Sequence, residues 1–368
     1  METRGGRRST EGEGAPERGG AWARWRGRAW ARWRGLLSRG QLAVGRSDSV
    51  AGALAVLSAA WVFYQVFDAG LGESGNVPNF IIITLNALSL AGLFFLAASG
   101  LTLIFGLMRV VNMAHGSLYL LGGYIAWSLT SSLGVNWWVA VIVATLAAGV
   151  FGLAMEELFL RWNLGQDLRQ ALITIALSVI LADQMLNVFG GTAQQVSPPD
   201  LLAGPVGLGI YDLSYPAFRL FVVGVALAVG IALWFWIQRT RFGMVVRAGI
   251  DDGAMTSALG VNVRAVFAVA FFVGSCLAGL GGAFGGTVLS LAPGQDQVFL
   301  VSSIVVVIIG GMGSLAGAAI GALLLAFVEQ YSAVYLPSGF GPYSMVVTFV
   351  LVAAVLALKP TGLFGRPA

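Results

Sequence analysis

The most constraining feature of this sequence is a succession of apolar runs long enough to cross a lipid bilayer as helices. The hydrocarbon core of a bilayer is about 30 Å thick, so a helix needs about 20 residues to cross it. We predict an all-α polytopic membrane protein with about eight to ten transmembrane or re-entrant helices, because the third, eighth and ninth runs are short or interrupted by glycine. The runs are Val50–Phe67, Phe80–Phe105, Asn112–Leu129, Trp137–Met155, Ala171–Phe189, Ala217–Ile237, Ala265–Leu289, Phe299–Ile309, Leu315–Tyr335 and Tyr343–Leu358.

The composition and the charge pattern agree with this class. Apolar residues make up 57% of the chain and charged residues 10%, with a mean hydropathy of +0.83, which is far from the values of soluble domains. Cytoplasmic loops of membrane proteins are rich in lysine and arginine. Placing the N-terminus inside leaves Arg219 as the single one of 21 basic residues at an outer edge, so we expect both termini in the cytoplasm.

The first part of the chain, residues 1–49, differs in kind from residues 50–368, which we take as the transmembrane domain. It is basic, and the segment AWARWRGR from Ala21 is repeated as AWARWRG from Ala29. On a helix the four tryptophans would share one side, which suits a helix lying on an anionic membrane surface. A disordered extension, or a start codon placed too far upstream, is the alternative. Nucleic-acid binding is not expected.

Two glycine-rich breaks in the apolar pattern are candidates for the translocation pathway. Polar groups at a break inside a membrane are costly unless they line a path, and interrupted segments in two halves of a chain often form one. Tight turns between spans are an equally good interpretation. The first break, FGLMRVVNMAHGS, supplies Asn112, His115, Gly116 and Ser117, and the second, IIGGMGSLAG, supplies Gly311, Gly313, Ser314 and Gly317.

Isolated polar residues within the runs are further candidates. Asp183, Gln184 and Asn187 share a helical face, and an uncompensated charge in a membrane costs at least about 2.5 kcal/mol. We expect Asp183 to face the protein interior or a wet cavity, either on the pathway or in a structural pair. Glu329 has Arg219 as a possible partner.

Several kinds of chemistry are excluded by what the sequence lacks. The chain has one lysine, Lys359, with no glycine-rich phosphate loop before it, so it does not bind ATP in that way. A single histidine and a single cysteine, Cys276, argue against a zinc site, a cysteine–histidine nucleophile and a disulfide. We therefore expect no enzyme activity, no catalytic residues, no metal and no cofactor bound by this chain.

Residues 238–264 form the longest inner loop between two spans. Asp251 and Asp252 suit the start of a short helix, and Gly260 suits its end. A short helix in such a loop could be the surface that a partner protein binds. An ordinary solvated connection would have the same sequence pattern.

Three separated motifs in order carry a family resemblance. They are NALSLAGLFFLAASGLTLIFGLMRVVNMAHGSLYLLGGY, RTRFGMVVRAGIDDGAMTSALGVNV and GGMGSLAGAAIGALLLAFVE. Together they resemble the permease subunits of branched-chain amino-acid ABC importers of the bacterial inner membrane. The resemblance implies four kinds of partner: a second related permease, two ATP-binding subunits that use ATP, an extracytoplasmic solute-binding protein and the lipid membrane.

The inner loop resembles the coupling helix through which such permeases contact their ATPases. The positions that match are Arg247, Ala248, Asp252, Leu259 and Gly260, whereas Gly253 and Thr256 depart from the family pattern. The implied solute is a branched-chain amino acid, another amino acid, urea or a short amide. An ATP-independent channel or uniporter for a small solute, and a scaffold that transports nothing, are the rival functions.

Overall fold

The structure is a computed structural model that describes residues 77–108, 111–163, 165–209, 211–251, 256, 260, 262–335, 344–359 and 362–364. The basic arm and the run Val50–Phe67 lie outside the described residues. The helices are α2 (Val77–Met108), α3 (His115–Trp127), α4 (Trp137–Met155), α5 (Asp167–Phe189), α6 (Ala217–Arg239), α7 (Arg241–Asp251), α9 (Val263–Val288), α10 (Gln295–Gly310), α11 (Leu315–Tyr335) and α12 (Ser344–Leu358).

Within these ranges, six helical stretches are long and apolar enough to cross a membrane. They include α2, α5, α6, α9, α11 and the stretch Trp137–Asn163, which begins with α4. Each coincides with a predicted run to within a few residues, except that the stretch of α4 continues as one π-helical turn (Glu156–Leu160) and one 3₁₀ turn (Arg161–Asn163). The predicted fold class, a polytopic helical membrane protein, is confirmed.

Three further apolar helices are shorter than a bilayer crossing. α3 has 13 residues, followed by a π-helical turn at Ser128–Ser132, α10 has 16 residues and α12 has 15. At 1.5 Å per residue, α3 and α10 are about 20 and 24 Å long. The run Asn112–Leu129, predicted as a possible span, is therefore a short non-helical entry followed by α3 and the beginning of its π-helical turn.

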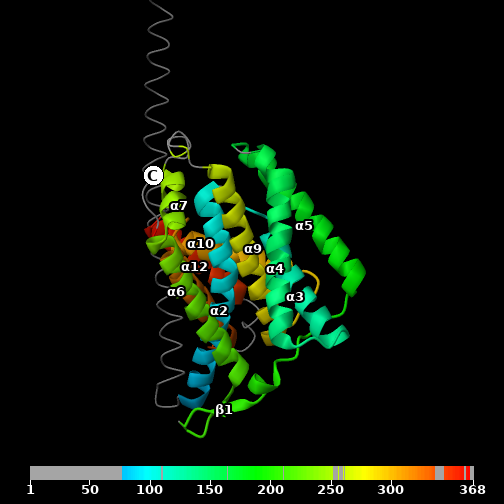
Figure 1. Ribbon diagram of the computed structural model, residues 1–368. Helices are drawn as coiled ribbons and strands as arrows, with labels where there is room; N and C mark the ends of the chain where they lie inside the picture. The colour runs from blue at the N-terminus through cyan, green and yellow to red at the C-terminus, as the bar shows by residue number, and fades with distance from the viewer. Residues whose placement is uncertain are drawn as a thin grey trace, which may run out of the picture. The chain divides into compact units, whose positions relative to one another are not determined.

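The helices α2 and α9 form the centre of the described structure, and α3, α4, α6, α10 and α11 pack around them (Figure 1). Close approach of the two central helices depends on a pair of glycines. A Cβ atom at Gly274 would lie 2.8 Å from the carbonyl oxygen of Gly100 and from side-chain carbons of Ile104. The small-residue stripe Gly274, Ala278, Gly282 and Gly286 thus lets backbones meet, as such stripes do in membrane helices.

The two ends of the helices are marked by different small elements (Figure 1). At one end, β1 (Pro205–Gly207) and β2 (Ser214–Pro216) form an antiparallel hairpin that leads directly into α6. At the other end, α6 leads into α7, whose Val246 packs with Leu103 of α2 and Val266 of α9. We call these the hairpin end and the α7 end.

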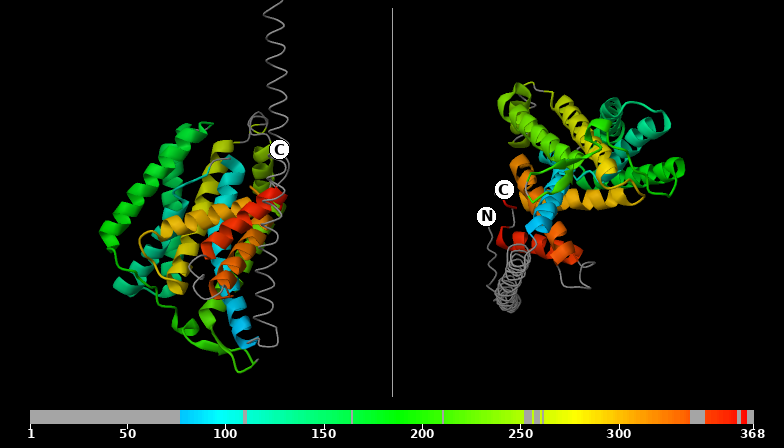
Figure 2. Two further views of the ribbon diagram at one scale, coloured as in Figure 1. Left: turned by 180° about the vertical axis from the view of Figure 1, so that it is seen from behind. Right: turned by 90° about the horizontal axis from the view of Figure 1, so that it is seen from below.

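Helix α5 lies at the margin of the helices, outside α3 and α4 (Figure 2). Its most apolar window is only 17% buried within this chain, compared with 61% for α2 and 56% for α9. Most of the surface of α5 therefore faces lipid or another protein.

Candidate functional site

The chain doubles back between α2 and α3. α2 ends at Met108, yet the Nε2 atom of His115, the first residue of α3, lies 2.8 Å from the carbonyl oxygen of Ala97. Ala97 is 11 residues before the end of α2, which corresponds to about 16 Å along the helix axis. α3 therefore begins beside the middle of α2 and runs on to the hairpin end, where Trp127 packs against Phe189 at the end of α5.

Helix α10 begins at the same depth as α3. A Cβ atom at Gly116 would collide with the backbone carbonyl of Asp296, so the first turns of the two helices are in direct backbone contact. The Ser117 hydroxyl lies 3.5 Å from Oδ2 of Asp296. Two half-helix N-termini thus meet inside the molecule, an arrangement that in transporters presents backbone N–H groups to a solute.

Asp296 is a buried carboxyl group at this junction, with 3% of its surface exposed. No lysine, arginine or histidine nitrogen of the described residues lies within 4.0 Å of it. Its place in the first turn of α10, against the first turn of α3, puts it where helix dipoles stabilise negative charge. Sequence reasoning missed Asp296, although an acidic residue after the Pro293–Gly294 pair is a recognisable signal for a helix start.

A line of polar side chains on α5 faces the first break, and we call it the polar seam. It consists of Gln170, Thr174 and Ser178, spaced by one helical turn. Thr174 accepts a hydrogen bond from the Met113 backbone N–H at 3.2 Å, and the Ser178 hydroxyl lies 3.0 Å from that of Ser117. The predicted residues Asn112, His115, Gly116 and Ser117 therefore lie together, enclosed by α2, α5 and α10.

The second break is a tight turn between α10 and α11. Gly311 ends α10 with φ +99°, and Gly313 has φ +78°, which is the left-handed region that favours glycine. The Ser314 hydroxyl accepts a hydrogen bond from the Gly317 N–H at 3.0 Å, as an N-terminal cap does. Gly317 packs directly against Gly310, so the two helices leave the turn in close contact.

The two breaks approach each other at the α7 end. A Cβ atom at Gly313 would lie 3.4 Å from the Cα atom of Gly106, near the end of α2. They are nevertheless unlike in structure, since the first returns into the middle of the molecule and the second reverses the chain at its edge. The helix junction inside the molecule joins the first break to the start of α10, 16 residues before Gly311.

Asp183 does not face the interior of this chain. It lies on the exposed side of α5, as do Gln184 and Asn187, whereas Leu181 and Met185 face inward. Asp183 stands six residues before the end of α5 at the hairpin end, which is about 9 Å along the axis. An acidic residue on an otherwise apolar outer face is unfavourable against lipid.

At the hairpin end, Arg219 is held by Asn86 rather than by Glu329. The Arg219 guanidinium donates to Oδ1 of Asn86 at 2.6 Å, and the Tyr215 hydroxyl donates to the same oxygen at 2.9 Å. Burial raises the pKa of Tyr215, and the neighbouring Arg219 opposes that shift. The suggested Arg219–Glu329 ion pair is absent among the described residues.

The inner loop contains the helix α7, which begins earlier than predicted. α7 ends at Asp251, whereas Asp251 was expected at a helix start. Ala248 is exposed, as is Met244 one turn before it, and Gly260 has φ +83°. Arg247 lies in α7, while Asp252 and Leu259 are outside the described residues.

Within the described part of the chain, no cluster of three or more histidine, cysteine, aspartate or glutamate side chains is arranged to hold a metal ion. The expectation of a chain without metal or cofactor stays a prediction.

Comparison with known proteins gives a consistent result. The family described as "Branched-chain amino acid transport system / permease component" matches residues 83–356. The high-affinity branched-chain amino acid transport system permease protein BraD of Pseudomonas aeruginosa is 30% identical over 308 residues, covering 79% of this chain and 98% of BraD. LivH of Escherichia coli K12 is 29% identical over 295 residues, covering 77% and 94%. LivM of the same organism is 25% identical over 307 residues, covering 76% and 69%.

Proposed function

The chain belongs to the branched-chain amino acid transport permease family, and from this premise we propose that it is the transmembrane subunit of an ATP-driven importer. The solute is a branched-chain amino acid or a related small polar molecule, delivered at the outer face by a solute-binding protein. ATP hydrolysis takes place in two separate ATPase subunits. Differential affinity of these subunits for two states of the permease would drive the change in access.

The observation that carries the proposal is the form of α7. Val246 anchors this helix to the ends of α2 and α9, and Phe242 stacks on Trp236 of α6 with ring centroids 4.7 Å apart. A partner that pushes on the exposed side of α7, at Met244 and Ala248, would therefore act on three long helices together. This is the mechanical requirement for a coupling helix. We extend the same role to Arg247, Asp252, Leu259 and Gly260.

The proposed path runs past the junction of α3 and α10 and along the outer side of α5. Asn112, His115, Gly116 and Ser117 belong to that junction, with Asp296. The exposed Asp183 supports a second, related permease packed near α5, because a water-lined gap between two subunits would keep this carboxylate out of lipid. Gly311, Gly313, Ser314 and Gly317 would form the turn that transmits movement to α10.

The α7 end is proposed to be cytoplasmic. Arg161, Arg169, Arg239, Arg241, Arg264 and Lys359 lie toward this end, whereas Arg219 lies toward the hairpin end. The positive-inside rule then places the hairpin outside and the termini in the cytoplasm of a bacterial inner membrane.

The proposal is tested by placing a charge on α7. Ala248→Arg is expected to abolish ATP-driven uptake and to remove the ATPase subunits from the purified complex, because a long cation cannot fit a close helix interface. Trp162→Arg is the matched control, since Trp162 is also exposed and near the α7 end but belongs to the 3₁₀ turn that follows α4. Abundance in the membrane is measured for both variants.

Two results would contradict the proposal. The first is full ATP-driven uptake by Ala248→Arg at normal abundance. The second is uptake by the purified chain alone in liposomes without any ATPase, which would identify a channel or uniporter.

A further inference from the structure

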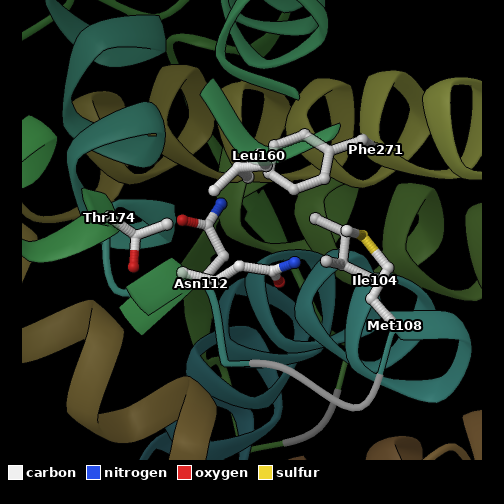
Figure 3. Close-up of a pocket in the computed structure, with 7 residues that line it drawn as sticks. Ile104, Met108, Asn112, Leu160, Thr174 and Phe271 are labelled. Carbon is white, nitrogen blue, oxygen red and sulfur yellow. The ribbon is translucent and has the colours of Figure 1, made fainter. Parts of the chain in front are cut away.

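A small pocket lies beside the non-helical segment that precedes α3, between α2, α5, α9 and the turns that follow α4. Four apolar side chains line it together with three polar ones, Asn112, Gln170 and Thr174. Figure 3 shows Asn112 between Thr174 on one side and Ile104 and Met108 on the other. The three polar residues are 2%, 1% and 1% exposed, so bulk water does not solvate them.

In the side-chain amide of Asn112, the oxygen has a hydrogen-bond partner and the nitrogen has none among the described residues. Its Oδ1 accepts a hydrogen bond from the Ala114 backbone N–H at 3.0 Å, and this contact fixes which way round the amide sits. Its Nδ2 has no hydrogen-bond partner among the described residues. Asn112 therefore presents a buried N–H donor at the pocket.

The side-chain amide of Gln170 is also paired at one end only, but here the unpaired atom is the oxygen. Its Nε2 donates to the Asn163 backbone carbonyl at 2.7 Å, so the orientation of this amide is fixed as well. Its Oε1 has no hydrogen-bond partner in the described part of the chain. The same pocket thus holds one buried unpaired donor and one buried unpaired acceptor, each costing about 1–3 kcal/mol if left unpaired.

We propose that this pocket is a binding site for a single water molecule that bridges Asn112 and Gln170. The bridging molecule must accept a hydrogen bond from Nδ2 and donate one to Oε1, which water does. The pocket has room for about one water molecule, so a solute of amino-acid size does not fit. Buried waters of this kind typically satisfy polar groups that the protein leaves unpaired.

The water would complete the polar seam. Two contacts of the seam are direct hydrogen bonds, between Thr174 and Met113 and between Ser178 and Ser117. The third contact, between Gln170 and Asn112, would be made through the bridging water molecule. Three successive turns of α5 are then attached to residues 112–117, the first break and the start of α3. The indirect contact is the one nearest the α7 end of α5.

The direct test is an experimental structure of the full complex at a resolution that shows ordered water. We expect one isolated density peak within hydrogen-bonding distance of both Asn112 Nδ2 and Gln170 Oε1. Absence of a peak between two well-ordered amides, a direct amide–amide contact, or density for a larger molecule would each overturn the proposal.

A thermodynamic cycle gives an independent test. Asn112→Ala and Gln170→Ala each remove one side of the same bridge, so the drop in melting temperature of the double variant should be smaller than the sum of the two single drops. In the control cycle, Gln170→Ala is combined with Ser332→Ala on α11, and the drops should add. Additive drops in the Asn112 cycle contradict the bridge. If these variants do not accumulate, the density alone decides.

Discussion

At the scale of single residues, His115 illustrates how a polar side chain is used at a membrane break. It is 1% exposed and sits at the first position of α3, where its Nε2 contacts the Ala97 carbonyl. If Nε2 carries the proton, this contact is a hydrogen bond that ties the start of α3 to the middle of α2. The side chain is enclosed by protein, with no route of polar groups leading from it in the described residues that would suit proton transfer.

We predict that His115→Ala destabilises the protein without changing the pH dependence of uptake. The substitution removes a buried hydrogen bond and leaves a cavity, which together cost about 2–4 kcal/mol. The measurement is the melting temperature of the purified complex, with uptake recorded at several pH values. A shift of the pH profile at unchanged stability would instead indicate a proton step at His115.

At the scale of elements, helix separation is set by glycine where backbones touch. Gly274 on α9 meets Gly100 on α2, whereas no atom of another helix lies within 4 Å of the position that a Cβ would take at Gly224 on α6. The sequence shows glycine in both places. Only the packing tells which glycine is required.

We predict opposite results for alanine at these two positions. Gly274→Ala forces α2 and α9 apart, because the atoms it meets include backbone, and is expected to cost about 1–3 kcal/mol. Gly224→Ala is the matched control and should leave stability unchanged or raise it by up to about 1 kcal/mol through helix propensity. The measurement is the melting temperature of each variant. An equal fall in melting temperature for both variants would contradict the packing argument.

At the scale of the whole molecule, the described helices alternate in direction between the α7 end and the hairpin end. The single cysteine of the chain, Cys276, makes the orientation easy to measure. We predict that, in a Cys276→Ser background, Leu201→Cys reacts with a membrane-impermeant maleimide in intact cells. Leu201 is 83% exposed in the segment that leads to the hairpin.

Ala248→Cys serves as the opposite marker and should react only after the cells are permeabilised. The assay uses cells without the ATPase subunits, so that no partner covers α7. Labelling of Ala248→Cys in intact cells, with none of Leu201→Cys, would reverse the proposed orientation.

The positions of the long helices could be predicted from the sequence, because hydrophobic length alone selects segments that cross about 30 Å of hydrocarbon. The glycine stripe on α9 could also be predicted from the sequence. Which side of each helix is buried could not be predicted. Asp183 was expected to face the protein interior or a wet cavity. It faces away from the interior of this chain, and a wet cavity beside it stays a prediction.

The sequence by itself thus determined the fold class, the family and the positions of the long helices, all of which depend on local composition or on motifs in order. Tertiary structure decided that α3 begins beside the middle of α2, that Asp296 meets it there, and that Gln170 and Asn112 line one pocket. The last two facts join residues that are 58 to 180 positions apart in the chain. No local pattern encodes such pairings, because they are fixed by how closely whole helices can pack.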